Sequence, residues 1–214
     1  MVSKRAYGQY CGFARALELV GERWALMIVR DLLVGPKRFS DLQRGLPGIP
    51  TNVLTARLKE MEQTGIVERV AQPRPAGGVA YQLTPGGTDL EAAVHALGRW
   101  GAKRLGDPRA DERVTVDSLV IALRSTFQPK AAKGKHLSIE MRFGPIVLHA
   151  IVKNGTIEAA PGPLPDADVV LQTGPAFRPL LAREMTPREA LKNGTAILRG
   201  PKNALDQFVE LFRI

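Results

Sequence analysis

The residues best suited to chemistry lie between positions 51 and 63, where small polar side chains recur every three or four residues. Leu54, Leu58 and Met61 form an apolar stripe of helical period, so this segment is predicted to be an amphipathic helix. Its opposite face carries Thr51, Asn52, Thr55, Ala56, Lys59 and Gln63. Asparagine can pair with adenine, threonine can bond base edges, and lysine can reach phosphate. The pattern therefore predicts a helix that reads DNA, or else a solvated helix face.

The elements around this helix would position it. A short helix is predicted over residues 39–45, with Ser40 and Asp41 as capping candidates, and a turn with two glycines and two prolines follows it. Gly65 is placed to end the reading helix. Strands over residues 66–70 and 79–84 then flank a loop at residues 73–78. This order predicts a winged helix-turn-helix, which places one helix in the DNA major groove.

Basic residues lie beside the predicted reading helix. Arg38 and Ser40 begin the preceding helix, and helix N-termini favour phosphate. Arg69 and Arg74 belong to the wing, where arginine on a glycine-bearing loop can enter an A·T-rich minor groove, although a solvated hairpin tip is the alternative. Arg57 either reaches a phosphate or pairs with a nearby glutamate. We take all five as candidate DNA contacts.

Helices are also predicted on both sides of the winged segment, at residues 13–20, 24–33 and 85–105. The last of them carries Leu90, Val94, Leu97 and Trp100, more apolar surface than a wing hairpin can cover. Such a surplus in winged-helix proteins usually packs against a second subunit. The sequence therefore predicts a homodimer.

Residues 11 to about 105 resemble the HxlR-type winged-helix regulators, relatives of the MarR group. The matching motifs are Cys11, Gly21-Glu22-Arg23-Trp24, Arg38-Phe39-Ser40-Asp41-Leu42, Gly48-Ile49, Leu54-Thr55-Ala56-Arg57-Leu58, Gly65-Ile66-Val67-Glu68-Arg69, Tyr81-Gln82-Leu83-Thr84-Pro85-Gly86 and Trp100. The resemblance implies a homodimer that binds double-stranded DNA at a palindromic operator, as a repressor (our preference) or an activator. Pro50 departs from the serine that often caps the family's recognition helix, which leaves the first base-contacting residue open.

Cys11 is the chain's only cysteine. Some HxlR-type proteins sense oxidants or electrophiles through a cysteine near this position, and Arg5 and Arg15 lie close by in sequence. Nearby positive charge can lower a thiol pKa and raise its reactivity. The resemblance thus implies a redox sensor, with a small inert residue as the alternative. A single cysteine excludes an intramolecular disulfide and a cysteine-based zinc site.

Composition narrows the classes of protein. The net charge is +9, and the excess leans toward the first half of the chain, as phosphate binding requires, although plain solubility explains it as well. The sequence has no apolar run long enough to span a membrane and no secretory signal, so we expect a cytoplasmic protein. His95, His136 and His149 are scattered, and phosphate-binding and nucleophile motifs are missing. We expect no enzyme, no metal and no cofactor.

Residues 107–113 are charged, contain a proline and cannot bury a face, so they are predicted to link domains at 1–106 and 114–214. The second domain is predicted to begin with a helix over residues 116–123. Strands follow at 136–144, 145–153, 156–160, 167–173 and 195–199, with helices at 175–183, 187–193 and 201–212. Asn154-Gly155 marks a hairpin turn. The fold class is α+β, a sheet covered on one face by helices.

This second half resembles the sterol-carrier-protein-like fold. The best matches are Ala167-Asp168-Val169-Val170-Leu171, Thr186-Pro187-Arg188-Glu189-Ala190-Leu191-Lys192-Asn193-Gly194, and Leu198-Arg199-Gly200-Pro201 with Leu205 and Phe208. The resemblance implies a cavity for an apolar small molecule, with candidate lining from Phe127, Met141, Phe143, Phe177, Leu180, Leu181, Phe208 and Phe212. The alternative is a plain core, which these residue types favour, because aromatic and aliphatic side chains are mostly buried.

Taken together, the sequence predicts a sequence-specific DNA-binding transcriptional regulator with an apolar effector bound to its C-terminal domain. The alternative is a carrier of lipids or other apolar ligands whose N-terminal module serves mainly for dimerisation. An enzyme with its active site in the C-terminal cavity is a third and weaker hypothesis.

Overall fold

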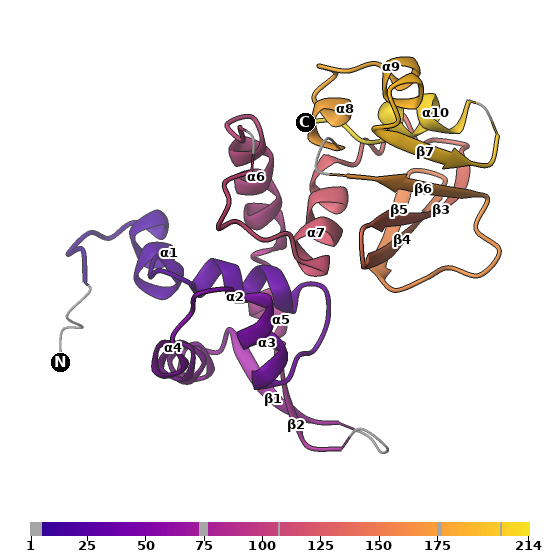
Figure 1. Cartoon of the computed structure of the whole chain (residues 1–214). Coiled ribbons are helices and arrows are strands. Elements are labelled where there is room, and N and C mark those ends of the chain that lie inside the picture. Colours follow the sequence, from indigo (N-terminus) through magenta and orange to yellow (C-terminus); the bar gives the residue numbers. More distant parts are fainter. Residues whose placement is uncertain (1–5, 73–76, 107, 175–176, 202) are drawn as a thin grey trace. The chain divides into compact units, whose positions relative to one another are not determined.

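The computed structural model describes residues 6–72, 77–106, 108–174, 177–201 and 203–214 (Figure 1). The chain forms two compact units, Met1–Val94 and His95–Ile214, which we describe one at a time. The division falls inside the helix α6 (Glu91–Ala102), ahead of the predicted linker at residues 107–113. The domain bounds 1–106 and 114–214 stay a prediction.

The N-terminal unit is a winged helix-turn-helix, as the sequence predicted. Its elements in chain order are α1 (Gly12–Val20), α2 (Ala25–Leu32), α3 (Phe39–Gly45), α4 (Thr51–Gln63), β1 (Val67–Ala71), β2 (Val79–Leu83) and α5 (Pro85–Thr88). The two strands pair antiparallel, with Arg69 opposite Tyr81. Ile28, Leu42 and Leu54 are fully buried and form the centre of this small core.

The ends of α4 show how the sequence sets its length. Gly65 has a left-handed φ of +71°, which glycine adopts without strain, and it ends the helix as predicted. Pro50 is the N-cap residue, with φ −68° and no side-chain cap, and its carbonyl accepts from the Leu54 N–H at 3.0 Å. Proline suits this position because the N-cap residue contributes only its carbonyl to the helix. The unpaired N–H groups of the first turn belong to the residues that follow it.

The single helix predicted over residues 85–105 is wrong, because the structure divides it into α5 and α6. The Thr84 hydroxyl caps α5 by accepting from the Gly87 N–H at 3.1 Å. Gly87 packs so closely that a Cβ there would lie 2.1 Å from the Ile66 carbonyl oxygen. This turn of helix is thus held against the end of α4 and the wing, and the chain starts a new helix at Glu91.

The C-terminal unit is an α+β layer whose sheet has the strand order β5-β4-β3-β6-β7. Its strands are β3 (His136–Phe143), β4 (Ile146–Lys153), β5 (Thr156–Pro161), β6 (Val169–Thr173) and β7 (Ala196–Arg199). The helices are α7 (Val116–Thr126), α8 (Phe177–Leu181), α9 (Pro187–Lys192) and α10 (Ala204–Leu211). Strands β3 and β6 pair in parallel, and the other pairs are antiparallel. Asn154 and Gly155 form the predicted hairpin turn, both with positive φ.

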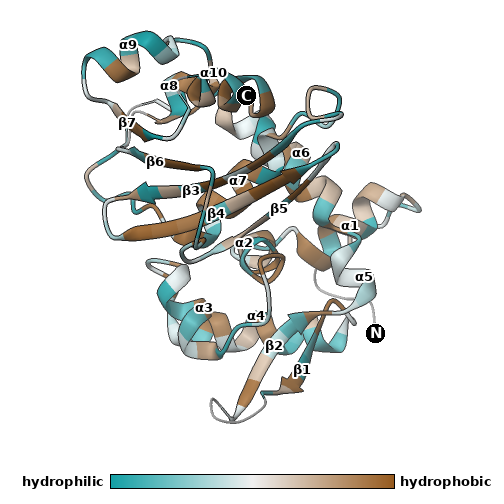
Figure 2. Ribbon diagram, turned by 90° about the vertical axis from the view of Figure 1, so that its right-hand side faces the viewer, coloured by the Kyte–Doolittle hydropathy of each residue, from teal (hydrophilic) through white to brown (hydrophobic). Residues whose placement is uncertain are grey.

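Alternation along the strands divides the sheet into two faces. Leu137, Ile139 and Met141 are buried under helices, with α7 packed against β4 and β5 and α9 against β7. The strands accordingly carry much of the brown, apolar colour in Figure 2. The other face holds Glu140, which is 4% exposed and accepts from the Leu164 N–H at 3.0 Å. The segment after β5 therefore crosses this second face.

Membrane insertion finds no support in the helices. Within the described ranges, none combines the length and the apolar character that crossing a bilayer requires.

Candidate nucleic-acid interface

Helix α4 presents one polar face to solvent, as the sequence predicted. Its apolar stripe is buried, with Leu54, Leu58 and Met61 at most 2% exposed. The opposite side chains are all exposed, namely Thr51, Asn52, Thr55, Ala56, Lys59 and Gln63. Burial of one stripe fixes the helix rotation, so these residues form one surface, which we call the α4 face.

The N-terminal part of the α4 face is ordered by hydrogen bonds. The Gln43 side-chain amide of α3 donates to the Thr51 hydroxyl at 2.7 Å, which ties the two helices of the motif together. The Thr55 hydroxyl donates to the Thr51 carbonyl at 2.9 Å, so its lone pairs remain available to a donor. Among the described residues, the Asn52 and Lys59 side chains form neither a hydrogen bond nor an ion pair. These two side chains are therefore available to a partner.

The start of α3 is capped by Asp41 rather than by Ser40. The Asp41 carboxylate accepts from the Arg38 N–H at 3.2 Å, and Ser40 is exposed. Burial raises the pKa of Asp41, but hydrogen bonds from the Arg44 side chain and the Arg38 backbone outweigh this and leave the pKa below its ordinary value. The Arg38 guanidinium itself donates to the Gly77 carbonyl of the wing loop.

Arg57 takes the second of the two roles that the sequence left open. Its side chain is 14% exposed and forms ion pairs with Glu60 and, at 3.3 Å, with Glu22. Glu22 precedes α2, so Arg57 joins α4 to the preceding part of the unit. Its position is that of a residue that holds the reading helix in place.

Arg69 is also engaged within the unit. Its guanidinium lies 3.0 Å from both carboxylate oxygens of Glu62 and 5.5 Å from the Tyr81 ring centre. It thus links the wing to the end of α4 in a two-bond geometry. Arg74, the other wing arginine of the sequence analysis, lies outside the described residues.

Cys11 is exposed and stands at the N-cap of α1. The backbone N–H groups of Ala14 and Phe13, in the first turn of α1, lower the pKa of the thiol. This cause differs from the one predicted, because Arg15 is ion-paired with Glu18 at 2.7 Å and Arg5 lies outside the described residues.

The residues predicted to line a C-terminal cavity come together as one aromatic cluster. Ring centroids are 5.8 Å apart for Phe127 and Phe212, 4.6 Å for Phe208 and Phe212, 5.4 Å for Phe177 and Phe208, and 5.2 Å for Phe143 and Phe177. Met141, Leu180 and Leu181 are buried as well. Contacts of this length are those of a packed core, which was the alternative interpretation.

Sequence reasoning missed three residues that position the α4 face. Gln43, Glu22 and Tyr81 contact Thr51, Arg57 and Arg69, respectively. None of them belongs to a pattern that periodicity or capping rules recognise, since each meets its partner from a different element. Within the described ranges, no group of three acidic, histidine or cysteine side chains is placed to hold an ion.

Comparisons with known proteins agree with this geometry. The model of the HxlR-like helix-turn-helix family matches residues 19–108. The HTH-type transcriptional regulator YodB of Bacillus subtilis is 41% identical over 85 residues, which are 40% of this chain and 76% of that protein. An uncharacterised HTH-type transcriptional regulator of Mycobacterium tuberculosis, Rv3095, is 42% identical over 107 residues, 50% of this chain and 66% of the relative, just under two thirds of its length.

A solved structure of a relative is similar to slightly less than half of the chain. The reduced form of YodB is 35% identical and covers 47% of this chain and all of its own, with a TM-score of 0.40. The named relatives are transcriptional regulators, a class of protein distinct from enzymes, which agrees with the expectation from the sequence.

Proposed function

The chain belongs to the HxlR-like helix-turn-helix family, and from that premise we propose that it is a sequence-specific DNA-binding transcriptional regulator. The α4 face is the observation that carries this proposal. It offers Asn52, Thr55 and Lys59 along one exposed side of an ordered helix. Asparagine and threonine suit base edges in the major groove, and lysine suits phosphate.

The remaining candidate contacts take two roles in this proposal. Ser40 and Arg38, at the start of α3, suit phosphate contacts. Arg57 and Arg69 act as positioning residues, because both are held by glutamates within the unit. These two roles account for the different environments of the arginines better than the assumption that every arginine binds phosphate.

We further propose a homodimer that binds a palindromic operator as a repressor. Leu97 and Trp100 of α6 are 52% and 59% exposed, and Phe13 of α1 is 73% exposed. Large apolar side chains at such exposure are typical of surfaces that a partner covers. Two recognition helices related by a two-fold axis would read half-sites about one helical turn apart.

We also propose that the C-terminal unit binds an apolar effector, whose role would be to favour one spacing of the two α4 helices. The aromatic cluster around Phe208 supports an apolar interior. Native mass spectrometry of gently purified protein tests this through a co-purifying small molecule. A carrier function without DNA binding, the rival hypothesis, would keep that ligand and lose all sequence preference on DNA.

Cys11 is proposed as a redox-sensing residue. It is exposed, and its helix N-terminal position lowers the thiol pKa, which favours the reactive thiolate. DNA binding measured before and after treatment with diamide or a quinone should change in the natural protein and stay constant in Cys11→Ser. An equal response of both proteins would remove the sensing role.

The main test is binding to the DNA that lies upstream of the chain's own gene, measured by fluorescence anisotropy from about 50 to 200 mM salt. We expect affinity for that DNA roughly a thousandfold or more above affinity for a scrambled duplex, together with a steep fall as salt rises. Light scattering on the same samples should give twice the mass of the chain. Equal affinity for both duplexes would refute the regulator function.

A further inference from the structure

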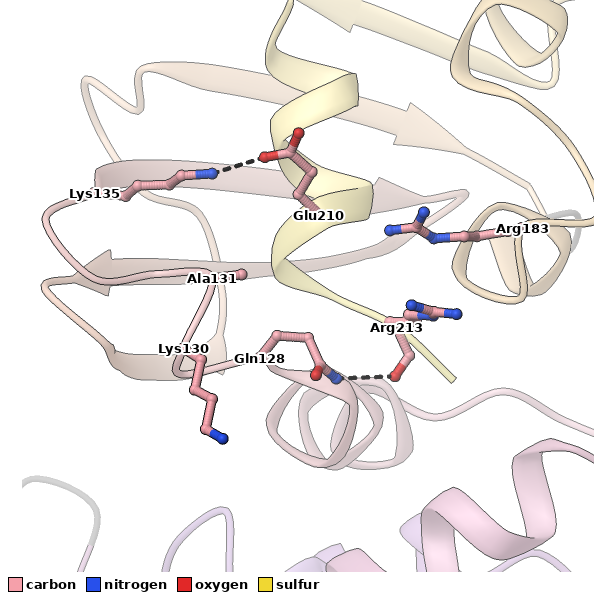
Figure 3. Close-up of a pocket in the computed structure, with 7 residues that line it drawn as sticks. All are labelled: Gln128, Lys130, Ala131, Lys135, Arg183, Glu210 and Arg213. Carbon is pink, nitrogen blue, oxygen red and sulfur yellow. Dashed lines mark hydrogen bonds and ion pairs between the residues drawn. The ribbon is translucent and has the colours of Figure 1, made fainter.

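A polar pocket of about 400 Å³ opens on the C-terminal unit (Figure 3). It is bounded by the loop after α7, the end of α8 and the last turn of α10. Its lining residues are Gln128, Lys130, Ala131, Lys135, Arg183, Glu210 and Arg213. The volume lies within the range of small-molecule sites.

The charge of this pocket is strongly positive. Four of its lining side chains are cationic and one is acidic. The Lys135 ammonium donates to the Glu210 carboxylate at 2.7 Å, and this bond, with the charges of Lys135 and Arg183, lowers the pKa of Glu210. Within the described part of the chain, Lys130, Arg183 and Arg213 have no carboxylate partner at ion-pair distance. The pocket therefore has an excess of positive charge that an anionic ligand could neutralise.

Arg183 occupies a backbone position that normally belongs to glycine. It follows α8 with a left-handed φ of +59°, and its N–H donates to the Leu180 carbonyl at 3.2 Å. The equivalent position after α4 holds Gly65 at +71°. A side chain at such a φ is strained relative to glycine. An arginine kept there points to a use for its side chain, which lines the pocket.

The base of the pocket is rigid. Phe127 and Phe212 form an isolated β-bridge, in which the Gln128 N–H donates to the Leu211 carbonyl and the Arg213 N–H to the Thr126 carbonyl, both at 2.8 Å. The Gln128 side-chain amide donates to the Thr126 and Arg213 carbonyls at 2.9 and 3.4 Å, as Figure 3 shows for Arg213. The Gln128 and Arg213 side chains therefore project from an ordered base, which lowers the entropy cost of binding.

We propose that this pocket binds a small molecule bearing a phosphate group, with Arg183 and Arg213 as its principal ligands. Guanidinium groups match phosphate oxygens with paired hydrogen bonds, and Lys130 adds a point charge. Glu210 neutralises Lys135, which leaves Lys130 and the two arginines, among the described residues, as the unmatched cations of the pocket. The site is independent of the α4 face and of the apolar effector, so its test is separate from theirs.

The experiment uses the full chain with two probes, inorganic pyrophosphate and a soluble short-chain phosphatidic acid. Calorimetry measures affinity, and the ¹H–¹⁵N signals of the Gln128 side-chain amide report binding at this pocket. We expect saturable binding of at least one probe with a shift at Gln128, and roughly tenfold or greater weakening in Arg183→Gln/Arg213→Gln. Pyrophosphate binding indicates a soluble phosphate ester, whereas binding of the phosphatidic acid alone indicates a lipid headgroup.

The matched control is Arg113→Gln/Arg188→Gln, which removes the same charge from two exposed arginines outside the pocket. It should bind like the natural protein. Arg183→Gly separates function from folding, because relief of the left-handed strain should keep or raise Tm while affinity falls. The proposal would be overturned if neither probe bound saturably or if the control variant weakened binding equally. It would also be overturned if the Arg183→Gln/Arg213→Gln variant lost DNA affinity but bound both probes as before.

Discussion

In the N-terminal unit, the side chains of the α4 face are exposed and mostly polar, whereas in the C-terminal unit most of those predicted to line a cavity are buried against one another. Asn52 and Lys59 stand free on a helix whose other face is core. Phe208 and Phe212 are at most 1% exposed. These polar side chains on an ordered surface indicate a partner, because folding requires only that the exposed positions of the helix be polar and does not require these particular residues. Buried aromatic residues fit a core and a cavity equally well.

Phe208→Ala is the change with the largest expected effect on this comparison. The ring lies between Phe177 and Phe212, with centroids 5.4 and 4.6 Å away. If the cluster is packed core, its removal should lower the free energy of unfolding by about 3–5 kcal/mol. Urea unfolding followed by circular dichroism measures this loss.

The control for that variant is Leu191→Ala on α9, where the side chain is 39% exposed. Its effect should stay within about 0.5 kcal/mol. A loss near that small value for Phe208→Ala as well would mean that the surroundings tolerate empty space, and the cavity interpretation would gain at the expense of the core.

Glu140 gives the stability of the C-terminal unit a pH dependence. The Leu164 N–H donates to its carboxylate at 3.0 Å and the Arg142 guanidinium at 2.6 Å, and these bonds, with the Leu164 bond foremost, lower the pKa of Glu140 below its ordinary value of 4.5. Because the folded pKa lies below the unfolded one, this stabilisation is complete above pH 4.5 and is lost as the pH falls through the folded value.

The expected loss is about 1.5–3 kcal/mol, the worth of a hydrogen bond to a charged group. Urea unfolding between about pH 3 and 6 should show it in the natural protein and a flatter profile in Glu140→Gln, which keeps the side-chain shape without the titration. Parallel profiles for the two proteins would show that other carboxylates set the acid response.

Most helices and strands of the N-terminal unit could be predicted from the sequence, because local rules determine where they begin and end. Gly65 ends α4 where a left-handed residue is needed, and the stripe through Leu54 and Leu58 fixes which side of that helix is exposed. The partners of the arginines were beyond such rules. Glu22 meets Arg57 only once α2 and α4 are packed, so no spacing in the sequence signals the contact.

The break between α5 and α6 and the polar pocket escaped prediction for the same reason. Gly87 lies within α5 and packs against the Ile66 carbonyl, a contact made by tertiary packing. Arg183 and Arg213 share a pocket although they come from segments far apart in the chain. No spacing in the sequence relates the two arginines, and only the fold brings their charges together.

Asn52→Ala tests the functional side of the comparison. If Asn52 reads a base, its loss should reduce discrimination between the operator and a single-base variant by about 1–3 kcal/mol. Fluorescence anisotropy on both duplexes measures the difference. Gln63→Ala removes an exposed amide from the far end of the same face and serves as the control, with discrimination unchanged. Equal weakening on every duplex would make Asn52 a phosphate-binding or folding residue.

Arg69→Gln should have the smallest effect, and it asks whether an exposed charge always indicates a partner. Arg69 is 56% exposed but is paired with Glu62 at 3.0 Å, so its removal should cost less than about 1 kcal/mol of stability. If it only positions the wing, the salt dependence of DNA binding keeps its slope. A phosphate contact would instead reduce that slope by about 0.9. In that case Arg69 contacts DNA directly despite its ion pair with Glu62, as we propose for Asn52 and Lys59.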